Sequence, residues 1–352
     1  MLYAGISWHA GGYRLAVLGP DGDRALTPID YAAPHADELI RRLRQLDTPD
    51  TPVTVAVEST NGTLDGRLMA AGLRVHRADP WLLPERPLFG SVPAEDLAGA
   101  SLNAAVGLVP LQAHRGTQTG REEQLADQIA ASADADRELT AAGRLFGHGP
   151  RDRREVALTF DDGPLPPYTG QILDILEGYG IPATFFCVGI NSGGFAEELA
   201  RMREQGHAIG NHTWSHPFLP ELTGPQLAEQ IDRTAEAIAE ASGGPAPRLF
   251  RPPYGARTPE VLGRLSRFDA TTLLWDVAPD DWALRRADAI ARDVLADVRP
   301  GSVVLLHDGG GDRSPTVAAL APIIEGLLED GYTFVRADTL VDRAATAPVG
   351  AP

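Results

Sequence analysis

Two histidines separated by three residues, His212 and His216, are candidates to bind one metal ion. On a helix this spacing places both imidazoles on the same face, one turn apart. The adjacent pair Asp161 and Asp162 ends an apolar run, and the Gly-Pro that follows would turn the chain so that both carboxylates face one site. Two histidines and one aspartate leave coordination positions for water or substrate, as in catalytic metal sites, with zinc preferred and Co²⁺, Ni²⁺ or Fe²⁺ as alternatives. One carboxylate would bind the ion and the other would accept a proton from its bound water.

Further polar clusters in the second half of the chain also follow apolar runs. They are Arg251 to Gly255, Asp276 to Trp282, and His307 with Asp308. In a parallel barrel the carboxyl ends of the strands meet on one face, where the connecting loops gather the functional groups. These positions therefore predict one shared site. Taken alone, the histidine pair would equally fit an accidental surface pair, and the aspartates a surface turn.

Alternation of short apolar runs and amphipathic stretches from residue 155 onward predicts this barrel. Strands are expected at 155–161, 183–189, 208–211, 248–251, 271–276, 302–306 and 332–336. Helices are expected at 169–179, 195–205, 224–241, 258–267, 286–298 and 316–330. Seven such repeats predict a parallel barrel slightly smaller than the eight-fold kind.

The first part of the chain has a different pattern. Three antiparallel strands, an amphipathic helix at 35–46, a buried strand at 53–58, a helix at 64–71 and a strand at 74–77 predict a ribonuclease-H-like α/β domain. The expected boundaries are a domain at 1–111, a helical linker without strands at 112–150, the barrel at 151–345 and a tail at 346–352.

Charge excludes some partners. The 352 residues include 31 basic side chains, all arginine, and 48 acidic ones, a formal net charge of −17. Such a chain has no surplus of cations to bind nucleic acid or an anionic membrane. We expect a cytoplasmic protein, because neither a secretion signal nor an apolar run of the ~18 residues that span a bilayer is visible. The single cysteine, Cys187, lies in an apolar run and is expected in the core.

Five segments in order resemble the motifs of the NodB-type polysaccharide deacetylases, carbohydrate esterase family 4. The segments are Thr159 to Pro164, His212 to His216, Arg251 to Gly255, Asp281-Trp282 and Leu305 to His307. The resemblance covers about residues 150–342 and implies a distorted (β/α)7 barrel. It also implies metal-dependent removal of acetyl groups from N-acetylated or, in some members, O-acetylated sugars.

This resemblance assigns the central roles. Asp162, His212 and His216 would hold the metal, and Asp161 would be the general base that deprotonates metal-bound water. His307 would be the general acid that protonates the leaving amine. An amine leaves poorly until it is protonated, and histidine is suited to that task near neutral pH.

The resemblance also assigns supporting roles. Arg251 would keep the general base ionised, and Asp281 would pair with the general acid. The backbone N–H of Tyr254 would help the metal to stabilise the oxyanion, and Trp282 and Leu305 would wall the pocket for the acetyl methyl group.

One departure from the family pattern leaves the partner of the general acid open. Family members often carry an acidic residue at the position of Ala278. Asp276, Asp280 and Asp281 are all nearby, and we favour Asp281 because a tryptophan follows it. Trp275 is expected in the barrel core.

The N-terminal part resembles the ribonuclease-H-like domain of DEDD transposases, over about residues 1–105. The matching segments are Gly5 to Trp8, Val55 to Gly62 and Arg74 to Pro80. Only Glu58 and Asp96 remain of the acidic quartet, because Ser7 and Gly99 occupy the other positions. Two-metal catalysis needs those carboxylates, so we expect no nuclease activity. The domain is expected to serve packing, homo-oligomer formation or coverage of the barrel.

The sequence thus predicts a metal-dependent hydrolase that removes N-acetyl groups from a soluble acetamido sugar, oligosaccharide or sugar-bearing intermediate by attack of metal-bound water. A metal-dependent amidase acting on a cyclic amide or ureide is one alternative. The other is a scaffold or regulatory protein that acts through its N-terminal domain.

Overall fold

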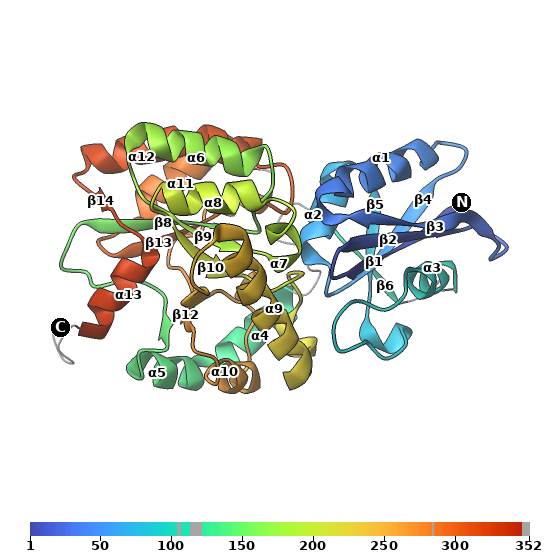
Figure 1. The fold of residues 1–352 in the computed structure, drawn as a ribbon, viewed down its shortest axis with the longest axis horizontal. Helices are drawn as coiled ribbons and strands as arrows, with labels where there is room; N and C mark the ends of the chain where they lie inside the picture. The colour runs from blue at the N-terminus through green and yellow to red at the C-terminus, as the bar shows by residue number, and fades with distance from the viewer. Residues whose placement is uncertain (104–106, 113–121, 284, 347–352) are drawn as a thin grey trace.

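The computed structural model describes residues 1–103, 107–112, 122–283 and 285–346, which form two α/β domains lying side by side (Figure 1). The N-terminal domain is drawn in blue and cyan. The C-terminal domain runs from green to red and contains all the deacetylase-like segments.

A six-stranded mixed sheet forms the N-terminal domain, in the order β3-β2-β1-β4-β5-β6. Its antiparallel part is β1 (Leu2–His9), β2 (Gly12–Leu18) and β3 (Arg24–Ala32). The strands β4 (Val53–Glu58) and β5 (Arg74–Ala78) continue it in parallel, and β6 (Leu108–Pro110) closes the edge antiparallel to β5. The predicted meander and the alternation that follows it are confirmed.

Helices cover both faces of this sheet. Ala4, Ile6 and Trp8 of β1 pack in one cluster with α1 (Ala36–Leu46) and α2 (Gly62–Ala70). On the other face, α3 (Ala94–Asn103) lies so close to Gly5 that a Cβ there would collide with the helix backbone. The sequence analysis missed α3 and β6. Short 3₁₀ turns stand at Ala33–His35 (η1) and Pro80–Leu82 (η2).

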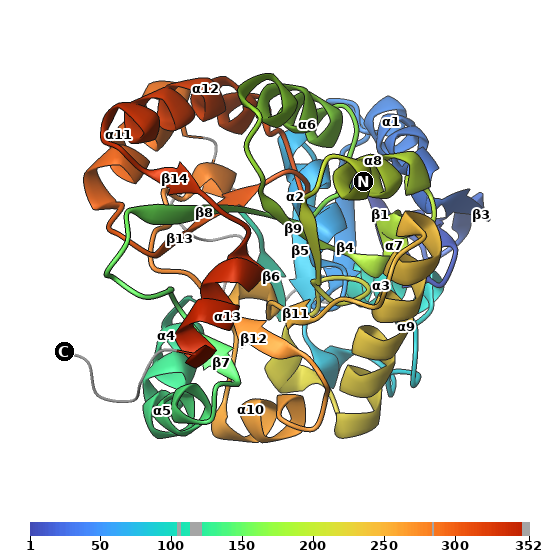
Figure 2. The same cartoon turned by 60° about the vertical axis from the view of Figure 1, so that its left-hand side comes forward.

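The C-terminal sheet is parallel and curled (Figure 2). Its order is β13-β8-β9-β10-β11-β12-β7, and β14 also pairs with β8. A parallel bridge between Val277 and Val304 links the segment after β12 to β13. The strands are β7 (Leu145–Phe146), β8 (Glu155–Asp161), β9 (Thr184–Cys187), β10 (Ala208–Asn211), β11 (Leu249–Phe250), β12 (Thr271–Leu273), β13 (Ser302–His307) and β14 (Thr333–Phe334).

Helices surround the curled sheet, and the six predicted ones are confirmed to within two residues at each end. They are α6 (Tyr168–Tyr179), α8 (Ala196–Glu204), α9 (Gly224–Ser242), α10 (Pro259–Leu265), α11 (Ala287–Asp297) and α12 (Ser314–Glu329). The sequence analysis missed α7 (Gly189–Ser192) and α13 (Ala337–Thr346). The latter packs with Ala157, Leu273 and Val303 in the cluster inside the curled sheet. Three 3₁₀ turns, η3 (Leu219–Glu221), η4 (Pro253–Gly255) and η5 (Asp281–Ala283), lie in the connecting loops.

The prediction that residues 112–150 lack strands is wrong. Residues 145–146 form β7, which pairs with β12, and a two-residue strand is too short to give a periodic pattern. The helices before it, α4 (Glu122–Ala131) and α5 (Ala133–Ala141), do not form a free linker. Asp136 pairs with Arg257 at 3.0 Å, and Ser132 donates to the Arg257 carbonyl. Residues 113–121 and 347–352, within the predicted linker and tail, lie outside the described residues.

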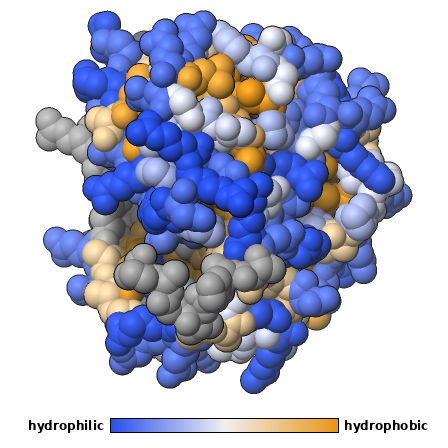
Figure 3. All heavy atoms as spheres, turned by 90° about the vertical axis from the view of Figure 1, so that its left-hand side faces the viewer, coloured by the Kyte–Doolittle hydropathy of each residue, from blue (hydrophilic) through white to orange (hydrophobic). Residues whose placement is uncertain are grey.

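Cys187 is buried among the side chains between the sheet and its helices, as predicted, and burial raises the pKa of its thiol. Within the described ranges, no helix has the length and apolar character needed to cross a membrane. Hydrophilic side chains dominate the face of the C-terminal domain that points away from the N-terminal domain (Figure 3).

Candidate metal centre and active site

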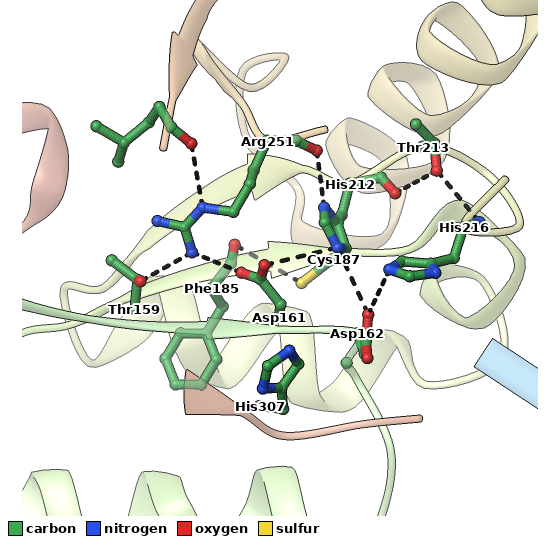
Figure 4. A network of polar contacts seen from close by, with 12 residues as sticks. Thr159, Asp161, Asp162, Phe185, Cys187, His212, Thr213, His216, Arg251 and His307 are labelled. Carbon is green, nitrogen blue, oxygen red and sulfur yellow. Dashed lines mark hydrogen bonds and ion pairs between the residues drawn. The ribbon is translucent and has the colours of Figure 1, made fainter. Parts of the chain in front are cut away.

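Strand β8 delivers both aspartates to one point. Val156, Leu158 and Phe160 pack outward against the helices, so Asp161 lies on the opposite, inner side. Asp162 would then point outward if the strand continued. Instead its backbone adopts a left-handed conformation, with φ of 76°, and its carboxylate also reaches the histidines (Figure 4). The turn expected after the pair is therefore present and begins at Asp162 itself.

The histidines converge without a helix, so the helical explanation of their spacing is wrong. Residues 212–216 form a loop after β10, in which Thr213 and His216 have left-handed φ values of 68° and 60°. The side-chain oxygen of Gln230 accepts the N–H groups of residues 214 and 215, at 2.9 and 3.1 Å. The loop brings the two imidazole centres to 4.9 Å from each other. Since α9 supplies Gln230, helix packing fixes the loop.

Asp162, His212 and His216 form a group of side chains suited to one metal ion. The Oδ1 atom of Asp162 lies 3.5 Å from Nε2 of His212 and 3.3 Å from Nε2 of His216. Two ligands ~2.1 Å from one ion, at tetrahedral or octahedral angles, lie about 3.0–3.4 Å apart, so these separations fit. The Oδ1 atom is buried without a hydrogen-bond partner, which a cation would relieve. His212 directs Nδ1 to the Arg251 carbonyl at 2.8 Å, which leaves Nε2 to ligate.

The electrostatics favour the ligating forms of two of these groups. Burial lowers the pKa of His216 to about 3, so its imidazole is neutral at neutral pH. Burial raises the pKa of Asp162, but the neighbouring histidines outweigh it and hold that pKa well below its usual range. Neutral imidazole and carboxylate are the forms that bind metal.

The second carboxylate, Asp161, is paired with a cation. Nη1 of Arg251 donates to Oδ1 of Asp161 at 2.7 Å and to Thr159 Oγ1 at 2.8 Å. Arg251 is fully buried, and its Nε donates to the Leu273 carbonyl at 3.1 Å. Oδ2 of Asp161 lies 3.6 Å from Nε2 of His212. Asp161 therefore lies beside the candidate ligands, and the buried guanidinium of Arg251 balances its charge.

His307 ends β13 and pairs with one of the three nearby acids. Its Nδ1 lies 2.7 Å from Oδ1 of Asp281, and its backbone N–H donates to Oδ2 at 2.9 Å. Thr316 also donates to Oδ2, at 2.7 Å. Burial lowers the pKa of His307, but the Asp281 carboxylate more than offsets this, so the pKa is raised. Asp276 instead accepts from Arg151 at 2.7 Å.

The remaining predicted residues surround this centre to different degrees. The Tyr254 ring meets the His216 ring edge-on, with centroids 4.4 Å apart. Leu305 is buried on β13, two residues before the histidine of that strand and on the same side. Trp282 is half-buried in η5, and Asp280 is exposed in the loop before it. Trp275 packs against the barrel core, as expected.

Sequence analysis placed Asp308 with His307 in one polar cluster but gave it no role, and it did not single out Arg313. Asp308 is fully buried and accepts from the Gly163 N–H at 3.1 Å and from Thr169 Oγ1 at 2.6 Å, so it fixes the loop after β8. Burial raises its pKa to about 7. Arg313 is buried beside it and donates to the Gly309 carbonyl at 2.6 Å. The position of Asp308 directly after the histidine of β13 was the one available signal.

Strained backbone gathers in these same loops. Among the described residues other than glycine, the positive φ values belong to Asp162, Thr213, His216, Tyr254 and Asp280. Each costs about 1–3 kcal/mol and persists only where surrounding contacts enforce it, as at functional sites. Every one of these five residues lies in a segment predicted to carry chemistry.

Comparison with known proteins agrees with the geometry. The family model described as polysaccharide deacetylase matches residues 148–273. A chitooligosaccharide deacetylase of Bradyrhizobium sp. (strain ANU 289) is 38% identical over 190 residues, which cover 51% of this chain and 87% of the relative. A peptidoglycan-N-acetylglucosamine deacetylase of Bacillus cereus is 36% identical over 207 residues, covering 58% of this chain and 96% of the relative.

A solved structure also matches. It is a peptidoglycan N-acetylglucosamine deacetylase in complex with an N-oxidanyl-benzamide, with 35% identity and a TM-score of 0.55, covering 58% of this chain and 95% of that one. The fold and site thus define a hydrolytic deacetylase with a curled parallel sheet. The chain belongs to the polysaccharide deacetylase family, carbohydrate esterase family 4, whose members use a divalent metal.

Proposed function

We propose that this chain hydrolyses the N-acetyl group of a soluble acetamido sugar or short oligosaccharide, releasing acetate and a free amine. The observation that carries the proposal is the meeting of an Asp-His-His group, an Arg-paired aspartate and an Asp-paired histidine around one point. Relatives named as chitooligosaccharide and peptidoglycan deacetylases support the substrate class.

The metal ligands in this proposal are Asp162, His212 and His216, with Zn²⁺ preferred and Co²⁺, Ni²⁺ or Fe²⁺ as alternatives. When bound, such an ion lowers the pKa of water to near 7 and polarises the acetyl carbonyl. The electrostatics described above favour the ligating forms of Asp162 and His216, and the hydrogen bond of His212 Nδ1 to the Arg251 carbonyl directs its Nε2 to the same point.

The proton transfers belong to the chain's own residues. Asp161 accepts a proton from the attacking water, and Arg251 orients that carboxylate by donating to its Oδ1. His307 donates a proton to the amide nitrogen, so that the amine leaves neutral, and Asp281 fixes the orientation of its ring. The water oxygen ends in acetate, and the carbonyl–nitrogen bond breaks.

Two further roles concern the acetyl group. The backbone N–H of Tyr254 is assigned to the developing oxyanion, in keeping with the left-handed turn that places this residue against His216. Trp282 and Leu305 are assigned to the wall around the acetyl methyl group, since Trp282 directly follows Asp281 and Leu305 lies two residues before His307 on the same side of β13.

We further propose that the N-terminal domain has a ribonuclease-H-like fold without nuclease activity, and that the protein is cytoplasmic. In the described structure, Glu58 is buried and bonded to Thr60 and Arg86, whereas Asp96 is exposed on α3. Among the described residues, the metal-binding group is confined to the C-terminal domain. Homo-oligomer formation through the N-terminal domain stays a prediction.

Acetate release from a panel of soluble acetamido sugars, with and without chelator, tests this proposal. Cyclic amides and ureides belong in the same panel. We expect chelator-sensitive release from the sugars, lowered about 10²–10⁴-fold in Asp161→Asn and His307→Ala and unchanged in Asp276→Asn. Turnover of the cyclic substrates alone would favour the amidase alternative. No metal-dependent turnover of any substrate would refute the hydrolytic assignment.

A further inference from the structure

The N-terminal domain reaches the candidate metal centre directly, through the start of helix α2. A Cβ built on Gly62, the first residue of α2, would lie 2.6 Å from Nδ1 of His216 and 2.5 Å from its carbonyl oxygen. The hydroxyl of Tyr254 is equally close to that position. The backbone of Gly62 therefore packs against a candidate ligand and against the residue assigned to the oxyanion. This contact joins two segments about 150 residues apart in the chain.

Polar contacts continue from this point along the loop after β10. The Phe218 N–H donates to the Ser59 carbonyl at 3.0 Å, and Ser59 Oγ donates to the Glu221 carboxylate. Arg86 of the N-terminal domain lies 3.8 Å from the same carboxylate. The side-chain amide of Gln226 donates to the Arg86 carbonyl at 3.3 Å. The loop that carries His216 is thus bound to the N-terminal domain on its outer side.

Apolar packing holds the same contact. The Phe89 ring stands edge-on between Trp8 of its own domain and Trp214 of the histidine loop, with centroids 5.1 and 5.4 Å away. The guanidinium of Arg233 lies 4.3 Å from the Phe89 ring centre. Residues Val188 and Ile190, which follow β9, belong to the hydrophobic cluster of the N-terminal domain. Such a shared hydrophobic cluster favours a fixed arrangement of the domains over free relative motion.

The result is a metal centre with one side closed. The candidate ligands retain between 2% and 10% of their side-chain exposure, and His307 retains 13%. A cavity of about 350 Å³ lies between the two domains, lined by Arg67 of α2, by Leu165 in the loop after β8 and by Asp312 in the loop after β13. Its size lies at the lower end of small-molecule sites. A sugar unit inside a polymer is joined to further sugars on both sides, so it can bind only in a groove that is open at both ends.

We propose that the N-terminal domain is a fixed wall of the substrate site, which admits an acetamido sugar of one or two units, or a chain end, and excludes the interior of a long polymer. This inference rests on the proposed deacetylase function. The wall is formed by Gly62 at the metal centre and by the segment from Arg86 to Phe89 beside it. We assign the sugar to the cavity lined by both domains, because part of its lining comes from the loops that follow Asp162 and His307.

The test is the chain-length dependence of kcat/KM for acetate release from N-acetylated chito-oligosaccharides, from one to six units, and from a soluble acetylated chitin polymer. For the wild-type chain we expect kcat/KM, expressed per acetylated sugar unit, to fall more than tenfold from dimer to polymer, because interior units are excluded; this corresponds to more than ~1.4 kcal/mol. The variant Arg86→Ala/Phe89→Ala loosens the wall without touching the barrel residues assigned to catalysis. It should raise the ratio of kcat/KM on the polymer to kcat/KM on the dimer several-fold above the wild-type ratio. Leu88→Ala is the matched control, because Leu88 lies in the same segment with 55% of its surface exposed.

The outcomes separate the two proposals. Equal kcat/KM for dimer and polymer in the wild-type chain would refute the wall while leaving the deacetylase function intact. An equal increase for all chain lengths in Arg86→Ala/Phe89→Ala would show a movable lid and would also refute it. Turnover of no acetylated sugar by any variant would refute the proposed function, and this inference with it. Because the wild-type series needs no mutation, a double variant that fails to fold does not remove the test.

Discussion

The contact between Gly62 and His216 allows a sharp test with a single methyl group. In Gly62→Ala the added Cβ would begin 2.6 Å from Nδ1 of His216, whereas carbon and nitrogen pack comfortably at about 3.5 Å, so one side must move by roughly 1 Å. The neighbouring His216 carbonyl belongs to the backbone of a strained loop, so the imidazole or the whole loop has to shift. A displacement of ~1 Å at a reacting centre costs about 10²-fold in rate.

We therefore expect Gly62→Ala to lower kcat/KM for acetate release by about 10²-fold and to weaken metal binding, measured by competition with a chromophoric chelator. Gly99→Ala is the control, since a Cβ there, on α3 of the same domain, meets nothing within 4 Å. Alanine favours a helix over glycine by up to ~1 kcal/mol, so neither variant should lose stability from helix propensity alone. Wild-type metal affinity and turnover in Gly62→Ala would refute the claim that the N-terminal domain packs against the metal centre.

Three other predictions concern the centre itself. Asp281→Asn removes the carboxylate that raises the pKa of His307, so His307 should lose its proton at lower pH and the alkaline limb of the kcat/KM profile should move to lower pH. Asp276→Asn is the control and should leave this limb in place, and an unmoved limb in Asp281→Asn would contradict the pairing. Arg251→Met leaves the buried Asp161 carboxylate without its guanidinium partner and should lower the free energy of unfolding, measured by denaturant titration, by about 3 kcal/mol. The double variant Arg251→Met/Asp161→Leu should recover stability but no activity, and full activity in Arg251→Met would count against the assigned role. Removal of metal by a chelator should abolish turnover slowly, because the candidate ligands are buried. Added Zn²⁺, Co²⁺, Ni²⁺ or Fe²⁺ at ~100 times its Kd should restore turnover and raise the free energy of unfolding by about 2.7 kcal/mol. Activity that survives exhaustive chelation would exclude a catalytic metal.

Regular elements could be predicted from the sequence because their hydrophobic pattern is local. The bounds of β4, β8 and β10 match the predicted ranges residue for residue. The two-residue strand β7 was missed because its pairing with β12 depends on a partner more than 120 residues away. Tertiary pairing, not periodicity, makes residues 145–146 a strand.

The candidate site was predicted by residue type and order, and for the histidines the physical reason was wrong. The spacing of His212 and His216 suggested a helix, but a loop bonded to Gln230 brings the rings together. The left-handed backbone conformation of non-glycine residues such as His216 cannot be predicted from a single sequence, because tertiary contacts impose it. The approach of Gly62 could not be predicted either, because no pattern in one domain indicates which surface of another it will contact.

The hydrophobic cluster that Val188 and Ile190 share with the N-terminal domain has a consequence for how this protein tolerates change. Cutting the chain between the domains would expose these side chains and Trp214 to water, so the barrel alone should aggregate instead of behaving as a smaller enzyme. Melting should therefore proceed as one cooperative event. A destabilising substitution far from the active site, such as one in the core of the N-terminal sheet, would then reduce deacetylase activity by unfolding both domains.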